Sequence, residues 1–121
     1  MIILNHKISI IMMDKDNDGR DLSALNTKAK KLLTSAFGGL TATKAEGLWF
    51  DDDRLYVDES HIFTCNYNGK LYDTQAKAFI DVIKDELSKG RQQAVSIMLD
   101  DKMLILDGSD LDELRDILAT K

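Results

Sequence analysis

The chain has 121 residues, 44% of them hydrophobic, and a formal net charge of -5 at pH 7. This length and apolar content predict one domain over residues 1–121, with a core that needs neither metal nor disulfide bonds. The acidic balance argues against a nucleic acid polymer as partner, and the lone cysteine, Cys65, excludes an internal disulfide framework and is expected to be a buried thiol in a reducing compartment.

The first 13 residues hold two apolar patches that are interrupted by Asn5, His6 and Lys7. No small-residue cleavage site follows them, so the pattern predicts a strand over 8–13 instead of a signal peptide. No stretch approaches the roughly 20 apolar residues that a membrane span requires. We therefore expect a cytoplasmic protein that makes no membrane contact.

A polar loop over 14–21 precedes a helix, whose apolar residues recur at helical spacing up to the stop at Gly38. Strands are expected over 40–50 and 54–67, joined by an acidic turn over 51–53. Asp73 is expected to cap a second helix that ends at Gly90. A hairpin over 94–106 turns at Asp100, and Ser109 is expected to cap a short terminal helix.

The order strand, helix, strand, strand, helix, strand predicts an α+β fold of the ferredoxin-like split βαββαβ type, with an extra C-terminal strand and short helix. Both helices should cover one face of the sheet. The strands over 40–50 and 54–67 carry apolar residues on both alternations, for example Leu48 and Phe50 against Trp49. We therefore expect the open face to be buried against a second copy, in a homodimer or a multiple of dimers.

Three apparent motifs are weaker than they look. The segment 14–19 matches the first half of a calcium loop, but Leu25 stands where a bidentate glutamate is needed, so a solvated connecting loop is favoured. His6 with Ser9 and His61 with Thr64 would point to opposite sides of a strand, which argues against a two-histidine hydrolase. The histidines are then expected at a surface or rim.

The candidate ligand-binding residues are aromatic, basic and amide side chains near strand ends. Trp49 and Tyr56 flank Arg54, and aromatic rings beside a guanidinium suit a purine and a phosphate. Arg91 could bind a phosphate, or could instead pair with Asp85 or Glu86, while Trp49 could be core. The set is completed by Glu59, which could bind a ribose or pair with a lysine, and by two amides that could read a base edge, Gln92 and Gln93.

A longer pattern joins the first helix to the two long strands. Its residues are Phe37, Gly38, Gly39, Thr41, Gly47, Trp49, Asp52, Val57, Glu59 and Ser60, with a weaker echo at Gln93, Ala94 and Val95. The pattern resembles that of the phage Thoeris anti-defence proteins, within a wider group of small phage and bacterial α+β domains. The resemblance implies an oligomeric sponge in the host cytoplasm that binds a cyclic nucleotide signal, a cyclic ADP-ribose isomer.

The sequence shows no Gly-rich phosphate loop, no Cys/His metal cluster and no Ser, His and Asp set at recognisable spacing. We therefore expect no enzyme, no catalytic residue, no metal and no cofactor, but sequestration of a cyclic nucleotide without cleavage. The alternative is a protein-interaction module that inhibits a host defence protein through its surface. An enzyme would require His6, Glu59 or another titrating group to line a deep cleft.

Overall fold

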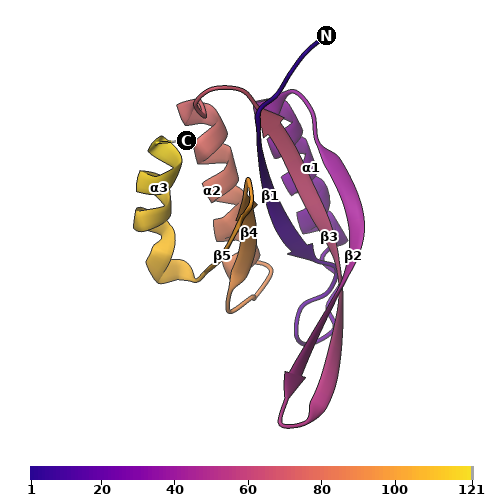
Figure 1. The fold of residues 1–121 in the computed structure, drawn as a ribbon. Helices are drawn as coiled ribbons and strands as arrows, with labels where there is room; N and C mark the ends of the chain where they lie inside the picture. The colour runs from indigo at the N-terminus through magenta and orange to yellow at the C-terminus, as the bar shows by residue number, and fades with distance from the viewer. Residues whose placement is uncertain (121) are drawn as a thin grey trace.

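The computed structural model describes residues 1–120, and all five strands found there belong to one antiparallel sheet (Figure 1). The elements are, in chain order, β1 (His6–Met13), α1 (Ser23–Phe37), β2 (Thr41–Asp51), β3 (Arg54–Tyr67), α2 (Asp73–Ser88), β4 (Val95–Leu99), β5 (Lys102–Leu106), the 3-10 turn Gly108–Asp110 and α3 (Leu111–Ala119). No helix of this part of the chain is long and apolar enough to cross a membrane.

The strand order β2-β3-β1-β4-β5 confirms the fold class predicted from the sequence. The first four strands have the ferredoxin-like arrangement, in which two split βαβ units place β1 and β3 at the centre. The extra hairpin strand β5 pairs with β4, and α3 follows it beside α2 (Figure 1). The sheet therefore has β2 and β5 as its two edges.

Successive side chains along each strand point alternately toward the helices and toward the open side of the sheet. The face that is covered by the helices carries the core. Ile8, Ile10 and Met12 on β1 are fully buried, and Phe63 and Cys65 face the same way from β3. Buried residues of the three helices complete the core: Ala29, Leu33, Phe79, Ile80, Val82, Ile83, Leu114 and Leu118. Cys65 is a buried free thiol, and burial raises its pKa to about 11.

The opposite face is open in the single chain. Ser9 of β1 and Thr64 of β3 lie side by side there and share a hydrogen bond of 2.8 Å between their hydroxyl oxygens. His6 and His61 lie on the helix-covered face, so each histidine and its hydroxyl are on opposite sides, as the alternation requires. On β5, Met103 and Ile105 remain exposed.

The β2–β3 hairpin extends well past the rest of the molecule, and we call residues 46–59 the arm (Figure 1). Leu48 pairs with Val57 and Phe50 with Leu55, so these four exposed side chains share one face of the arm. The turn at the tip uses two residues with positive φ, Asp52 and Asp53, which fits the preference of Asp for turns. The arm thus exposes apolar side chains that the core leaves uncovered.

Two helix starts differ from the sequence-based expectation. Asp73 is the first residue of α2, and Tyr72 precedes it with its N–H donating to Gln75 Oε1 at 2.9 Å. The terminal helical segment is capped by Asp107, not by Ser109, because Asp107 Oδ1 accepts the Ser109 N–H at 2.8 Å. In both cases several polar residues near the start compete for the cap, and spacing alone does not choose between them.

Candidate functional site

The candidate site is a cleft where the loop after β1 meets the root of the arm. Two adjoining cavities of about 400 and 420 Å³ share Asp14, Lys15 and Glu59 in their walls. The Asp14 N–H donates to the Glu59 carbonyl oxygen at 3.1 Å, which fixes the loop against β3. Volumes of this size lie in the range of small-molecule sites.

His61 and Asp14 form a histidine–carboxylate pair in the wall of this cleft. The pairing of Met12 with His61 places the end of β1 beside the histidine, and Asp14 Oδ1 lies 2.7 Å from His61 Nδ1. Both side chains are partly exposed, at 34% for His61 and 25% for Asp14. In the tautomer in which Nδ1–H donates a hydrogen bond to the Asp14 carboxylate, Nε2 of the neutral imidazole is the proton acceptor.

The remaining wall of the first cavity comes from the start of α1. Lys30 stretches over the ring of Phe63, with its ammonium nitrogen 5.6 Å from the ring centroid. Asp21 precedes the helix and accepts both the backbone N–H and the hydroxyl of Ser23, at 2.8 and 3.1 Å. The cleft therefore carries carboxylates and ammonium groups close together, over a partly aromatic floor.

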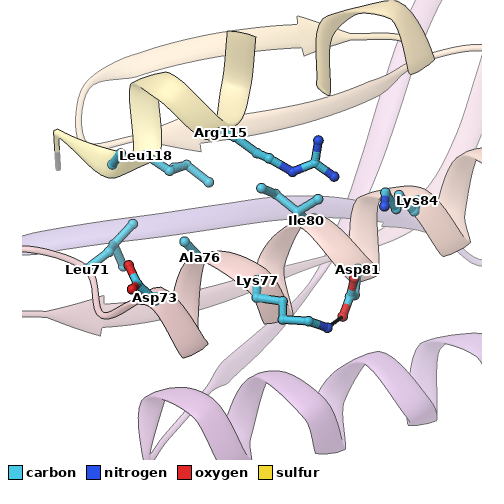
Figure 2. A pocket seen from close by; sticks show the side chains of 10 residues that line it. Leu71, Asp73, Ala76, Lys77, Ile80, Asp81, Lys84, Arg115 and Leu118 are labelled. Carbon is cyan, nitrogen blue, oxygen red and sulfur yellow. Dashed lines mark hydrogen bonds and ion pairs between the residues drawn. The ribbon is translucent and has the colours of Figure 1, made fainter. Parts of the chain in front are cut away.

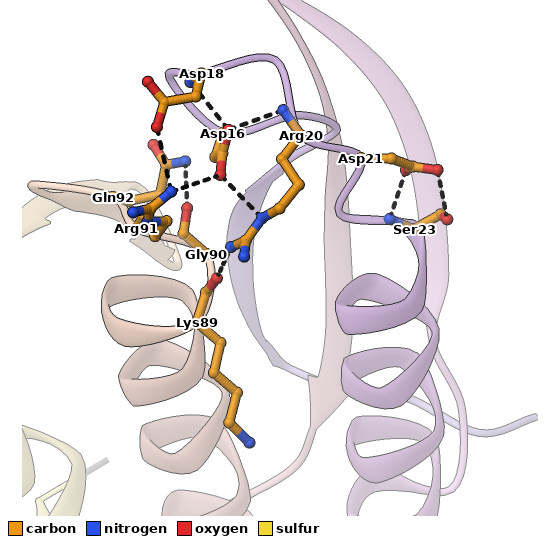
Figure 3. Close-up of polar contacts among 9 residues, drawn as sticks. All are labelled: Asp16, Asp18, Arg20, Asp21, Ser23, Lys89, Gly90, Arg91 and Gln92. Atoms are coloured by element: carbon orange, nitrogen blue, oxygen red, sulfur yellow. Dashed lines mark hydrogen bonds and ion pairs between the residues drawn. The ribbon is translucent and has the colours of Figure 1, made fainter.

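A network around Asp16 holds the loop after β1 in place (Figure 3). The Asp16 side chain is fully buried, its Oδ1 accepts the N–H groups of Asp18 and Arg20 at 2.9 Å, and its Oδ2 lies 3.0 Å from Arg20 Nε. Backbone N–H donation, chiefly from Arg20, lowers the pKa of this carboxyl. The Asp16 carboxylate, which a calcium loop would use as a ligand, therefore points into the loop. Residues 1–120 contain no group of three side chains that could together hold a metal ion.

Two further buried polar residues, Asn26 and Glu86, lie beneath the loop, between α1, α2 and the end of β1. Asn26 Nδ2 donates to the Met13 carbonyl oxygen at 3.1 Å, and Glu86 is only 1% exposed. Burial raises the Glu86 pKa to about 7, and neither carboxyl oxygen has a hydrogen-bond partner among the described residues. Gly90 packs so closely on this residue that an added Cβ would lie 2.5 Å from the Glu86 carbonyl oxygen.

Four of the predicted ligand-binding residues lie on the arm. Trp49 and Tyr56 stack at 4.5 Å between ring centroids, with Arg54 5.0 Å above Tyr56, and Trp49 Nε1 donates to Asp58 at 2.8 Å. Trp49 is 48% exposed, so it is not core. Glu59 lies at the root and lines both cavities. The structure thus groups the aromatic residues and arginine near the tip, apart from Glu59.

The other three lie in the loop before β4, where Arg91 belongs to the Asp16 network (Figure 3). Arg91 has a positive φ of 53° and pairs with Asp18 at 3.2 Å, not with Asp85 or Glu86. Gln92 Nε2 donates to the Gly90 carbonyl oxygen at 3.0 Å, and Gln93 is exposed. Arg91 thus fastens this loop to the loop after β1, and none of the three residues lines either cavity of the cleft.

Asp14, His61 and Lys30 line the cleft although the sequence pattern did not predict them as site residues. Alternation along β3 does place His61 on the buried face with Phe63 and Cys65, which was a usable signal. The partner Asp14 is 47 positions away and becomes predictable only when the β1–β3 register is known. The histidine does lie at a rim, as expected, but with a carboxylate partner.

Two solved structures of phage SAM lyase share this fold. One, in complex with S-methyl-5'-thioadenosine, is 10% identical, with a TM-score of 0.63 over 90% of this chain and 96% of that chain. The other, in the apo state, is also 10% identical, with a TM-score of 0.56 over 89% of this chain and 95% of that chain. No family model matches the sequence, and no curated protein matches it either.

These neighbours correct the expectation that the chain is not an enzyme, because the fold it shares is that of a lyase. They also support only the wider part of the resemblance, to small phage proteins, and not the Thoeris sponges. At 10% identity the likeness establishes the fold alone, so ligand and reaction have to be argued from the cleft.

Proposed function

We propose that the cleft at the root of the arm binds a small adenosine-type molecule with a cationic centre. In this proposal His61, oriented by Asp14, is the base that removes a proton from the bound molecule. The observation that carries this proposal is the 2.7 Å contact between His61 Nδ1 and Asp14 Oδ1 in the wall of a cavity of about 400 Å³. A base oriented by a carboxylate is a recurrent catalytic arrangement. The neighbour bound to a thioether nucleoside supports this ligand class.

Charge in the cleft favours a sulfonium such as SAM over an uncharged nucleoside. Asp14 and Glu59 are common to both cavities, and Asp58 joins them in the second. Carboxylates stabilise a nearby cation, most strongly where water is partly excluded. Lys15 and Lys30, on the same walls, would hold the carboxylate that an amino-acid side chain brings with it.

The proposed reaction is loss of a neutral thioether from the sulfonium. His61 Nε2 takes a proton from the carbon beside the one bonded to sulfur, and the C–H electron pair forms a carbon–carbon double bond. The C–S bond breaks with its two electrons moving to sulfur, so the nucleoside leaves as a neutral thioether. The imidazolium, stabilised by Asp14, then returns its proton to water.

The biological role we propose is anti-defence by removal of a small nucleotide-like molecule from the host cytoplasm. A cyclic ADP-ribose isomer, the ligand implied by the resemblance of the sequence, is the alternative occupant of the same cleft. The aromatic stack of Trp49 and Tyr56 lies nearer the tip of the arm and lines neither cavity, so it does not distinguish between the two ligands. Removal by cleavage replaces the sequestration without cleavage that was expected from the sequence.

A second copy of the chain completes the assembly in this proposal, as a homodimer or a multiple of dimers. Phe50 is 73% exposed and Leu48 58%, and with Val57 and Leu55 they form a contiguous apolar face on the arm. Exposed patches of this kind mark interaction surfaces. Pairing between arms would cover them and leave the cleft at the arm's root next to a neighbouring subunit.

The test is incubation of the pure protein with SAM, followed by mass spectrometry of the products. We expect S-methyl-5'-thioadenosine together with an unsaturated amino acid. His61→Gln should abolish both, whereas His6→Gln, in the other His–Asp pair, should not. Parallel samples with cyclic ADP-ribose isomers test the alternative. If neither ligand is converted or retained, the proposal fails.

A further inference from the structure

A third cavity, separate from the cleft, lies between α2 and α3 (Figure 2). Its volume is about 490 Å³, and it shares no lining residue with the two cavities at the arm. Small-molecule sites in proteins commonly have this size. The groove therefore has the capacity of a binding site independent of the proposed function.

The lining of the groove follows helical spacing along one stripe of α2. From Asp73 it runs through Ala76, Ile80 and Asp81 to Lys84, and α3 contributes residues from Arg115 onward. The eleven helical steps from Asp73 to Lys84 correspond to a length of about 16 Å. The groove is thus long and narrow, and its two ends differ in chemistry.

One end is apolar. Leu118, which is 1% exposed, and Ile80, at 4%, form the floor, with Leu71 beside them. The small side chains of Ala76 and Ala119 line the same stretch, where a larger residue would fill the space. This end offers contacts to the apolar body of a ligand, and the carboxylate of Asp73, beside Leu71, would repel an acidic group there (Figure 2).

The other end is cationic, although the whole chain carries a net charge of -5. The guanidinium of Arg115 extends along the groove above Ile80, toward the end where Lys84 lies (Figure 2). Arg115 Nη1 donates to Asp112 at 2.7 Å, but Asp112 is 96% exposed, so this pair is weak and exchangeable. Lys84 Nζ pairs with no acid among residues 1–120, whereas Lys77 is already paired with Asp81 at 2.8 Å.

We propose that the groove between α2 and α3 binds a small amphiphilic anion, with its acidic group on Arg115 and Lys84 and its apolar body over Ala76 and Leu118. Arg115 supplies the planar donor set that suits a carboxylate, sulfonate or phosphate, and Lys84 adds a point charge. The apolar end explains why the ligand is an amphiphile and not an inorganic anion. A neutral analogue lacks the group that the cationic end binds.

The experiment uses cis-parinaric acid, a conjugated fatty acid whose fluorescence rises when it leaves water, and its methyl ester. We expect saturable binding of the acid and at least about tenfold weaker binding of the ester, the effect of losing one charge-assisted contact. The double variant R115Q/K84Q should weaken binding of the acid to the level of the ester. Ala76→Phe should block both ligands, because it fills the groove.

Lys102→Gln, an exposed substitution on β5, is the matched control and should leave the affinity unchanged. The location is checked by ¹⁵N NMR, in which shifts are expected in 71–84 and 115–119. Circular dichroism verifies that each variant is folded. Equal binding of acid and ester, unchanged affinity in R115Q/K84Q, shifts confined to residues other than 71–84 and 115–119, or no binding at all would each overturn the proposal.

Discussion

His61 Nδ1 lies 2.7 Å from Asp14 Oδ1, across the junction between the end of β1 and the root of the arm. The two residues are far apart in the sequence, and the antiparallel register alone brings them together. A second pair, His6 with Asp100 at 3.1 Å, occupies the opposite end of β1 and provides an internal comparison.

Asp14→Asn should lower kcat by about 10²-fold or more and raise KM by a smaller factor, because Asp14 also contributes negative charge to the site of the proposed cation. The amide can no longer hold the proton on Nδ1, so Nε2 stops being the proton acceptor, and general bases typically contribute 10²–10⁴-fold. Steady-state kinetics with SAM measure the two constants separately. A rise in KM at constant kcat would instead assign Asp14 to substrate binding.

Glu86→Gln should stabilise the protein at pH 8 and make little difference at pH 4. Because burial raises the Glu86 pKa from 4.5 to about 7, the folded state holds a proton that the unfolded state releases between these values. Stability is therefore lost as the pH rises through this window, by up to about 3 kcal/mol, and is constant above it. Urea unfolding at several pH values measures the slope.

The matched control is Glu113→Gln, an exposed substitution on α3 that should leave the slope between pH 4.5 and 7 as it is. An unchanged slope in Glu86→Gln would show that Glu86 is solvated in the folded protein, in conflict with its 1% exposure.

Asp16→Asn should loosen the loop after β1 and lower Tm at neutral pH. The carboxylate accepts two backbone N–H groups and faces Arg20, contacts that lower its pKa below the ordinary 3.8. Its contribution to stability is present above the unfolded pKa and is lost as the pH falls through the folded one. Hydrogen exchange of the loop amides, compared between pH 7 and acid, should show the difference only at the higher pH.

Phe50→Ser combined with Leu48→Ser should dissociate the proposed oligomer into single chains. Both side chains are largely exposed on the arm, and removing them removes apolar area that a second copy would bury. Sedimentation velocity gives the mass. Ile105→Ser, equally exposed but at the opposite edge of the sheet, is the control; if it alone dissociates the oligomer, the interface is the open face near β5 and not the arm.

The fold was predictable because its signals are local. The apolar stripe from Ala76 through Phe79 and Ile83 defines α2, and the element order then selects the ferredoxin-like arrangement. Glu86 sits on the same stripe, three residues after Ile83, so its burial could have been inferred from helical spacing. The helix caps at Tyr72 and Asp107 could not be predicted in this way, because several neighbouring residues can occupy the cap position and spacing does not select one of them.

The site was less predictable because it depends on register and on loop packing. Alternation gives the side of the sheet that His61 faces, but only the pairing of β1 with β3 gives it Asp14 as a neighbour. Arg91 was predicted to bind a ligand, but it pairs with Asp18. This partner lies in a loop, and the course of a loop cannot be inferred from the periodicity of the sequence. Glu59 was the one predicted residue placed in the cleft wall.

The most direct test of the central claim is a ¹⁵N NMR titration of the whole chain with SAM. The account predicts saturable shifts in the loop after β1, at the start of α1 and around Glu59 and His61, and their loss in Glu59→Gln or His61→Gln. Shifts confined to the groove between α2 and α3, or none at millimolar ligand, would contradict it.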